Sequence, residues 1–342
     1  IFLMAITTVG ASPMNAQVTD IFSDEKMCDA TIHFNEPTDD VTLVFEMLYR
    51  GDVVESKTVS LGSVSVGDVT KMILWENKLQ EKSYTTNVSV YNSDSDKLIT
   101  RESYQFTHNT VAMPRFKIVD FYADSSKSSI LISPGSVSNP GVADIDIKLF
   151  KGSDLVYSET TDNVAILATK IIDTNWPILL QSGSDYMAVA RVFSHDPKIT
   201  TAYMSEFTAS EDVEIIDADV ELDEYGASIS MIGMSQVPFE GIVRIVLSGN
   251  GEPMVFEEEA EILTIGREDT VGIMWDGMPG GDYNVNVDIL TSKGVVLDSY
   301  ETVIRVPAPF VVDVELEEET PGFGIILGLS VLMAVGLFLR RK

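Results

Sequence analysis

The sequence predicts an all-β protein: three tandem antiparallel β-sandwiches followed by a C-terminal transmembrane helix. Three observations lead to this prediction. The only tryptophans, Trp75, Trp176 and Trp275, recur about every hundred residues, apolar and polar side chains alternate along many short segments, and an uncharged apolar run closes the chain. Alternation with a period of two is typical of strands that bury one face, whereas helices repeat about every 3.6 residues.

Residues 1–16 read as the remnant of a secretory signal peptide. Residues 1–11 are apolar and are followed by small and polar residues, which is the order of an h-region and its cleavage region. We expect cleavage after Ala11 or Ala16. The alternatives are a first β-strand or a retained second membrane helix, although eleven apolar residues are too few to span a bilayer.

The tryptophans define a repeat frame. Each is followed at nearly the same offset by a tyrosine, and a second tyrosine closes each unit. These pairs are Tyr84 and Tyr104, Tyr186 and Tyr203, and Tyr283 and Tyr300. Three units of about one hundred residues match the length of immunoglobulin-like sandwiches. We predict sandwiches over residues 17–109, 114–209 and 212–307, with the tryptophans and first tyrosines at core positions. The short linkers predict three beads in line, a rod of limited bending.

Two segments resemble known sandwich families. Residues 279–287, Pro-Gly-Gly-Asp-Tyr followed by an alternating strand, resemble the E–F corner of fibronectin type III domains. That resemblance implies that the hydroxyl of Tyr283 bonds back to nearby backbone. Residues 137–145, followed by Lys151 and Gly152, resemble CARDB-type adhesion sandwiches of bacterial and archaeal surface proteins.

Composition argues against several classes of function. The formal net charge of −30 disfavours polyanion partners, so we expect no nucleic acid binding. The single cysteine, Cys28, excludes an internal disulfide. The three histidines, His33, His108 and His195, lie far apart in the sequence and match no metal-binding or catalytic motif, and we expect them on the surface. We therefore predict a protein that is not an enzyme and has no cofactor.

Acidic residues supply one metal hypothesis. Asp217, Asp219, Glu221 and Asp223 alternate along a predicted strand, which spreads carboxylates along one face instead of converging them as Ca²⁺ requires. We interpret this row as a solvated face that also protects an edge strand. The alternative is a Ca²⁺ site at the junction of the second and third sandwiches, formed by Asp212, Asp217 and Asp219.

Two further features concern the surface. Asn87 begins the sequence Asn-Val-Ser, a candidate glycosylation site that we expect to face solvent, although an unused sequon is the alternative. In the second unit, Met187, Val189 and Phe193 make the outward face of a strand apolar, unlike the sister units. Such a face is predicted to be covered by a neighbouring unit, a second protein or a second copy of the chain.

The C-terminus predicts membrane attachment. After an acidic stalk, residues 308–320, there are seventeen uncharged residues from 323 to 339, about 26 Å of helix. The basic end predicts that the preceding chain lies outside the cell; its stop residues are Arg340, Arg341 and Lys342. The segment 321–342 resembles the PGF-CTERM sorting signal of archaeal surface proteins through Pro321, Gly322 and Phe323, although the usual long Thr-rich stalk is missing.

That resemblance implies that an archaeosortase removes the helix and joins the new C-terminus to a lipid; the alternative is an uncleaved anchor. We expect a non-catalytic protein at the extracellular face of the cytoplasmic membrane, in the archaeal cell envelope. It would act in attachment, scaffolding or adhesion, with an envelope protein or glycan as partner. The alternatives are an extracytoplasmic carbohydrate- or solute-binding subunit of a membrane complex and, less compatible with the inventory of residues, a cell-surface hydrolase.

Overall fold

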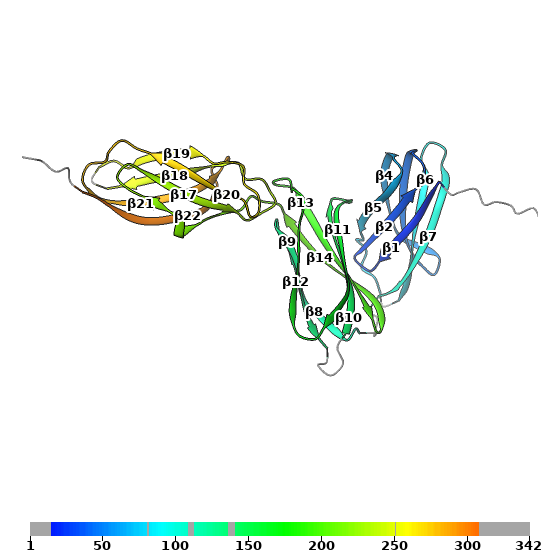
Figure 1. Cartoon of the computed structure of the whole chain (residues 1–342). Helices are drawn as coiled ribbons and strands as arrows, with labels where there is room; N and C mark the ends of the chain where they lie inside the picture. Colours follow the sequence, from blue (N-terminus) through cyan, green and yellow to red (C-terminus); the bar gives the residue numbers. More distant parts are fainter. Residues whose placement is uncertain (1–14, 81, 109–112, 136–140, 250, 308–342) are drawn as a thin grey trace, which may run out of the picture.

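The structure, a computed structural model, describes residues 15–80, 82–108, 113–135, 141–249 and 251–307 (Figure 1). Most of these residues lie in β-strands, and the one helical element among them is a three-residue 3₁₀ turn, which confirms the predicted all-β class. None of their helices has the length and hydropathy of a membrane span. The predicted sorting signal, helix and stalk at 308–342, and residues 1–14 of the predicted signal peptide, lie outside the described residues.

The first sandwich contains seven strands in two sheets, with orders β1-β2-β5 and β4-β3-β6-β7. Its strands are β1 (Ala16–Ser23), β2 (Met27–Phe34), β3 (Thr38–Tyr49), β4 (Asp52–Val64), β5 (Gly67–Leu74), β6 (Ser83–Asn92) and β7 (Lys97–Thr107). The side chain of Ala16 is fully buried. The first sandwich therefore begins before residue 17, inside the segment predicted as a signal peptide.

The second sandwich repeats this arrangement, with orders β12-β9-β8 and β11-β10-β13-β14. Its strands are β8 (Phe116–Ala123), β9 (Lys127–Pro134), β10 (Gly141–Lys151), β11 (Asp154–Ile166), β12 (Lys170–Asn175), β13 (Asp185–His195) and β14 (Lys198–Thr208). In both sandwiches the fourth strand pairs with the third, not with the fifth as in immunoglobulin constant domains. This is an immunoglobulin-like sandwich of the fibronectin type III kind.

The third sandwich has the same plan, but its first strand is split. Its elements are β15 (Val213–Ile215), η1 (Asp217–Asp219), β16 (Glu221–Leu222), β17 (Gly226–Gly233), β18 (Gly241–Ser248), β19 (Met254–Glu259), β20 (Glu268–Met274), β21 (Gly281–Thr291) and β22 (Val296–Val306). The expectation that the acidic row at 217–223 follows one strand is therefore wrong. The short 3₁₀ turn interrupts the strand, and Asp223 closes a turn by accepting from the backbone N–H groups of Tyr225 and Gly226.

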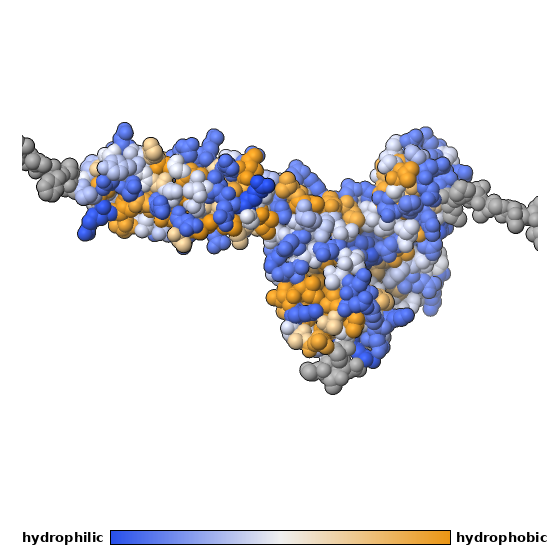
Figure 2. Space-filling model, in the orientation of Figure 1, coloured by the Kyte–Doolittle hydropathy of each residue, from blue (hydrophilic) through white to orange (hydrophobic). Residues whose placement is uncertain are grey.

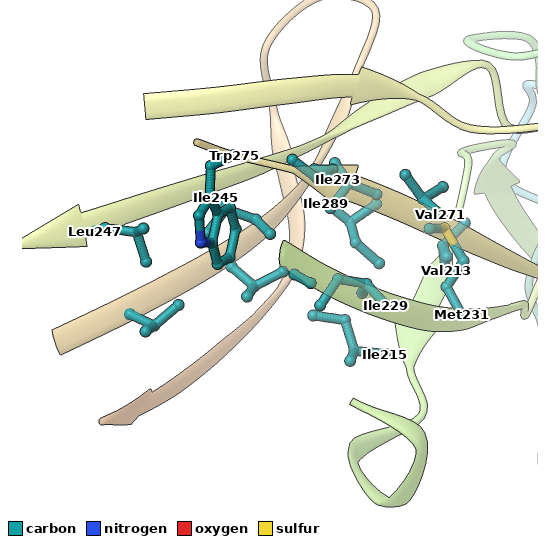
Figure 3. Packing of buried hydrophobic residues seen from close by; sticks show 14 of the residues in the cluster. Val213, Ile215, Ile229, Met231, Ile245, Leu247, Val271, Ile273, Trp275 and Ile289 are labelled. Atoms are coloured by element: carbon teal, nitrogen blue, oxygen red, sulfur yellow. The ribbon is translucent and has the colours of Figure 1, made fainter. Parts of the chain in front are cut away.

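Each sandwich has its own core, and the tryptophans occupy equivalent places. Each one directly follows the fifth strand, β5, β12 or β20, and is buried between the sheets. Figure 3 shows Trp275 beside Ile245 and Leu247 in the third core. The tryptophan backbone N–H groups donate to the turn after the first strand, at the carbonyls of Lys26, Ser126 and Tyr225.

A tyrosine corner follows in every sandwich. The hydroxyl of Tyr283 donates to the carbonyl of Pro279 at 2.9 Å. The hydroxyls of Tyr84 and Tyr186 instead accept from the backbone N–H groups four and five residues upstream, both at 3.1 Å. The tyrosine at this position therefore stabilises the corner as a hydrogen-bond donor in the third sandwich and as an acceptor in the first two, since a phenol can donate or accept.

The first two sandwiches do not lie in line, so the predicted rod is wrong for this pair. They lie side by side, whereas the third extends from the second (Figure 1). The two are joined edge to edge where β5 meets β11, through the backbone N–H of Met72 and the carbonyl of Ser153 at 3.0 Å. A single seven-stranded sheet, β1-β2-β5-β11-β10-β13-β14, therefore runs through both sandwiches.

Candidate functional site between the first two sandwiches

An apolar cluster joins the two sandwiches. It comprises Phe22, Met27 and Met72 from the first sandwich and Phe150, Met187 and Val189 from the second. All six are at least nine-tenths buried. The apolar face predicted from Met187 and Val189 is therefore covered, and of the three covers considered, the first sandwich is the one that lies on them. Phe193 is half-buried at the rim of this contact, 5.5 Å from the ring of His195.

Next to this cluster lies a network of five charged side chains. From the second sandwich, Arg191 contacts Asp20 at 2.6 Å, Asp146 at 2.8 Å and Asp29 at 3.2 Å. Lys148 lies 3.4 Å from both Asp20 and Asp29 and 3.7 Å from Asp146. Two cations of one sandwich thus bridge to two carboxylates of the other, and most of these contacts cross the junction.

Three members of the network are deeply buried, whereas Asp20 is 44% exposed and Asp146 21%. The side chain of Asp29 is 0% exposed, that of Lys148 6% and that of Arg191 13%. Burial raises the pKa of Asp29, despite Arg191 and Lys148 beside it. Its second oxygen, Oδ2, has no hydrogen-bond partner.

Asp20 responds differently to the same cations. Burial would raise its pKa, but the hydrogen bonds and charges of Arg191 and Lys148 bring it below its usual value. The carboxylates of Asp20 and Asp29 also raise the pKa of Arg191 against the effect of burial. Burying these charges costs desolvation energy, which is offset only where the cations and carboxylates contact one another. The network therefore favours the one relative placement of the two sandwiches in which these contacts form.

The second and third sandwiches are joined differently. The side chain of Val237, from the loop between β17 and β18, is 1% exposed and belongs to the core of the second sandwich. Backbone bonds flank it: Leu180 N–H donates to Gln236 at 3.0 Å, and Gln236 N–H donates to Ser125 at 2.9 Å. The Gln236 amide also donates to the carbonyl of Trp176. This joint is made by an inserted loop.

The histidines identified in the sequence are not brought together. His33 contacts Asp68 at 2.7 Å, His195 contacts Asp144 at 2.9 Å, and His108 lies 3.8 Å from Glu25. Each histidine thus lies beside a different carboxylate, and His108, whose side chain is only 20% exposed, departs from the expected surface position.

The acidic residues of the Ca²⁺ hypothesis do not form a metal-binding group either. Among the described residues, no three or more His, Cys, Asp or Glu side chains are arranged to hold a metal ion. Asp212 lies near other acids: burial, then Asp124 and Asp298, raise its pKa.

Asn87 is half-buried on β6, and its Oδ1 accepts from the Ser103 hydroxyl at 2.8 Å. The third residue of its sequon, Ser89, is fully buried.

Cys28 is free and buried in the first core, and burial raises the pKa of its thiol well above the ordinary value.

Sequence reasoning missed the charged residues of the junction. The available signals were local departures from pattern: Asp29 interrupts the otherwise apolar start of β2, and Arg191 stands alone among apolar outward residues of β13. Neither departure indicates which residue of the other sandwich the charged side chain contacts.

Comparisons with known proteins add little to this geometry. No protein-family model matches the sequence, and no curated protein is similar to it. Among solved structures, the FN1–FN3 domains of chicken CNTN1 are 12% identical over 85% of this chain and 97% of theirs, with a TM-score of 0.24. A two-domain fibronectin type III segment of chicken tenascin is 13% identical over 56% of this chain and 99% of its own, with a TM-score of 0.27.

PorU from Porphyromonas gingivalis is 10% identical over 85% of this chain but only 34% of its own, with a TM-score of 0.22. Such low TM-scores carry no argument about function. The assignment of the fold rests on the strand order and pairing within this chain.

Proposed function

We propose that the protein is a non-catalytic cell-surface protein, anchored in the archaeal membrane, that acts in envelope attachment, scaffolding or adhesion. The observation that carries the proposal is the junction of the first two sandwiches. Its apolar cluster and buried charges are the contacts that would hold the two domains in one arrangement. A rigid body presents a surface to a partner without the entropic cost of ordering two independent domains first.

The anchor in this proposal rests on residues 321–342, with Pro321, Gly322 and Phe323 as recognition residues for an archaeosortase-type processing enzyme. In that arrangement the third sandwich is a spacer between the membrane and the two-sandwich body. No metal ion or cofactor is part of the proposal.

Cross-linking mass spectrometry on intact native cells tests it. We expect recurrent cross-links from the first two sandwiches to one envelope component, and a mature chain that ends near Pro321. Cross-links confined to this chain would overturn the attachment role. An intact mass that still contains residues 324–342 would overturn the processing step and leave an uncleaved anchor.

A second candidate is an extracytoplasmic carbohydrate- or solute-binding subunit. It is supported by a groove of roughly 840 Å³ beside the junction, lined by apolar Met72, Leu74 and Phe207 and by acidic Asp185 and Glu206. Grooves of this size suit small ligands. Calorimetric titration of the full chain with oligosaccharides and small cationic solutes tests it, and a groove variant, Phe207→Ala, should abolish any heat that the wild-type chain gives.

A further inference from the structure

The outer face of the three-stranded sheet of the second sandwich is apolar and uncovered. Val119 and Tyr122 on β8 are 50% and 45% exposed, and Ile171 on β12 is 60% exposed. Leu167, 65% exposed, extends the patch at the start of β12, and Leu131 on β9 lies between the two edge strands. Figure 2 shows an apolar area over this part of the second sandwich. We call these five residues, with the charged residues described below, the β8-β9-β12 face.

The repeat shows what the equivalent face does in the first sandwich. There, Phe22 of β1 pairs with Asp29 of β2, which pairs with Met72 of β5. The corresponding row in the second sandwich is Tyr122, Ser129 and Asp173. Both first strands carry a bulge at the same place, ahead of Asp20 and Asp120.

In the first sandwich this row is the surface that docks on another sandwich, through Phe22, Asp29 and Met72. The β8-β9-β12 face is thus the equivalent surface of the repeat, and no residue that the structure describes covers it. In the first sandwich the row docks on a different face, that of β10 and β13, so the repeat indicates that this surface can be buried against a sandwich but does not choose its partner.

Charge distinguishes this face from the equivalent sheet of the third sandwich. Its outward charged residues are two basic and two acidic: Lys127 and Asp173 pair with each other at 3.0 Å, and Lys117 and Asp120 lie on β8. The whole chain carries −30. The equivalent sheet of the third sandwich has no basic residue on β15, β16, β17 or β20, and its central outward row is Glu221, Ser228 and Gly272.

We propose that the β8-β9-β12 face is an interface with a second copy of this chain. Two copies of so acidic a protein repel each other over most of their surface, and close contact is favoured where acidic and basic residues balance. A two-fold axis through this face brings the same patch of both copies together. Such an axis can set Lys117 of one copy against Asp120 of the other, while the apolar residues of both leave water.

Sedimentation velocity of the full chain, over about 1 to 100 µM, tests the proposal. We expect a reversible dimer. Ile171→Asp should raise the dissociation constant at least about tenfold, because each dimer would bury two new charges. The matched control is Val303→Asp on β22 of the third sandwich, which is 61% exposed and should leave the dissociation constant unchanged. Both sites are exposed, and circular dichroism checks that both variants fold.

A charge exchange gives an independent test. Lys117→Asp should weaken the dimer, and adding Asp120→Lys should restore it, because the two-fold axis pairs one position with the other. A wild-type chain that stays monomeric up to 100 µM would overturn the proposal, including the case in which the face binds a different envelope protein. An unchanged dissociation constant in Ile171→Asp would overturn it as well.

Discussion

The two junctions of the molecule hold their sandwiches by different means. Between the first and second, charged side chains from two sheet faces meet in a partly buried network of Asp20, Asp29, Asp146, Lys148 and Arg191. Between the second and third, a loop inserts one apolar side chain, Val237, and bonds through its backbone. The first joint lies across the sides of the sandwiches, and the second lies at their ends.

This difference shows how copies of one sandwich can be joined either side by side or end to end. The end-to-end joint is made by a loop and by turns at the ends of the two sandwiches, and its partners, such as Gln236 and Ser125, also lie far apart in the sequence. The lateral joint pairs residues as far apart as Asp20 and Arg191, 171 positions in sequence. It also depends on charge, so solution conditions and single substitutions should act on the two joints unequally.

Arg191→Ala should have the largest effect and act on the first joint only. It leaves Asp29, which is fully buried, with a poorly compensated charge, which we expect to lower the free energy of unfolding by roughly 3–5 kcal/mol. Urea unfolding measures this, and small-angle scattering should show the first two sandwiches separating. Arg305→Ala, which removes an exposed pair with Asp282, is the matched control. Equal stability of the two variants would contradict the importance of the network.

Val237→Ala should loosen the second joint and spare the first. The change removes two buried methyl groups from the core of the second sandwich, a loss of about 2 kcal/mol. Scattering should report a wider range of angles for the third sandwich. Val303→Ala, at an exposed site, is the control. Loss of the contact between the first two sandwiches in Val237→Ala would show that the joints are coupled.

Ser125→Ala should destabilise the second joint less than Val237→Ala does. The Ser125 hydroxyl accepts from the backbone N–H of Ser210 at 2.9 Å, and the residue is 8% exposed. Leaving this N–H without its partner should cost about 1 kcal/mol. Hydrogen exchange at Ser210, faster in the variant than in the wild type, measures the change. Unchanged exchange would mean that water replaces the hydroxyl.

Acid should change stability in opposite directions through two aspartates, Asp20 at the first joint and Asp212 near the second. The pKa of Asp20 is lowered in the folded protein, so its contribution to stability is present above its ordinary value of 3.8 and is lost as pH falls through the lowered pKa. The pKa of Asp212, near the second joint, is raised, so its charge opposes folding near neutral pH and that cost disappears as pH falls through the raised pKa.

The single variants Asp20→Asn and Asp212→Asn measure this contrast. Between pH 7 and about 3, Asp20→Asn should lose stability less steeply on acidification than the wild type, whereas Asp212→Asn should lose it more steeply. Melting temperatures across this range supply both slopes. Identical slopes in the two variants would contradict the opposite directions of the two pKa shifts.

Sequence reasoning succeeded where the signal is local and failed where it is not. Alternation along β21 and β10 predicted strands, because each side chain of a strand points to one face or the other. The acidic row at 217–223 was misread because a 3₁₀ turn can carry the same alternation over a few residues. The apolar outward face at Met187 and Val189 was predicted to be covered, but its residue pattern does not indicate whether a neighbouring sandwich, a second protein or a second copy of the chain covers it.

The sequence by itself thus determined three sandwiches with a repeated tryptophan and tyrosine, since these follow from periodicity and spacing within one unit. Only the tertiary structure decided that the first two lie side by side. Asp29 and Arg191 are 162 positions apart, and they pair only because the packing of the two sandwiches brings both to one contact. Burial at a contact between domains depends on the placement of whole sheets, which no local pattern of residues records.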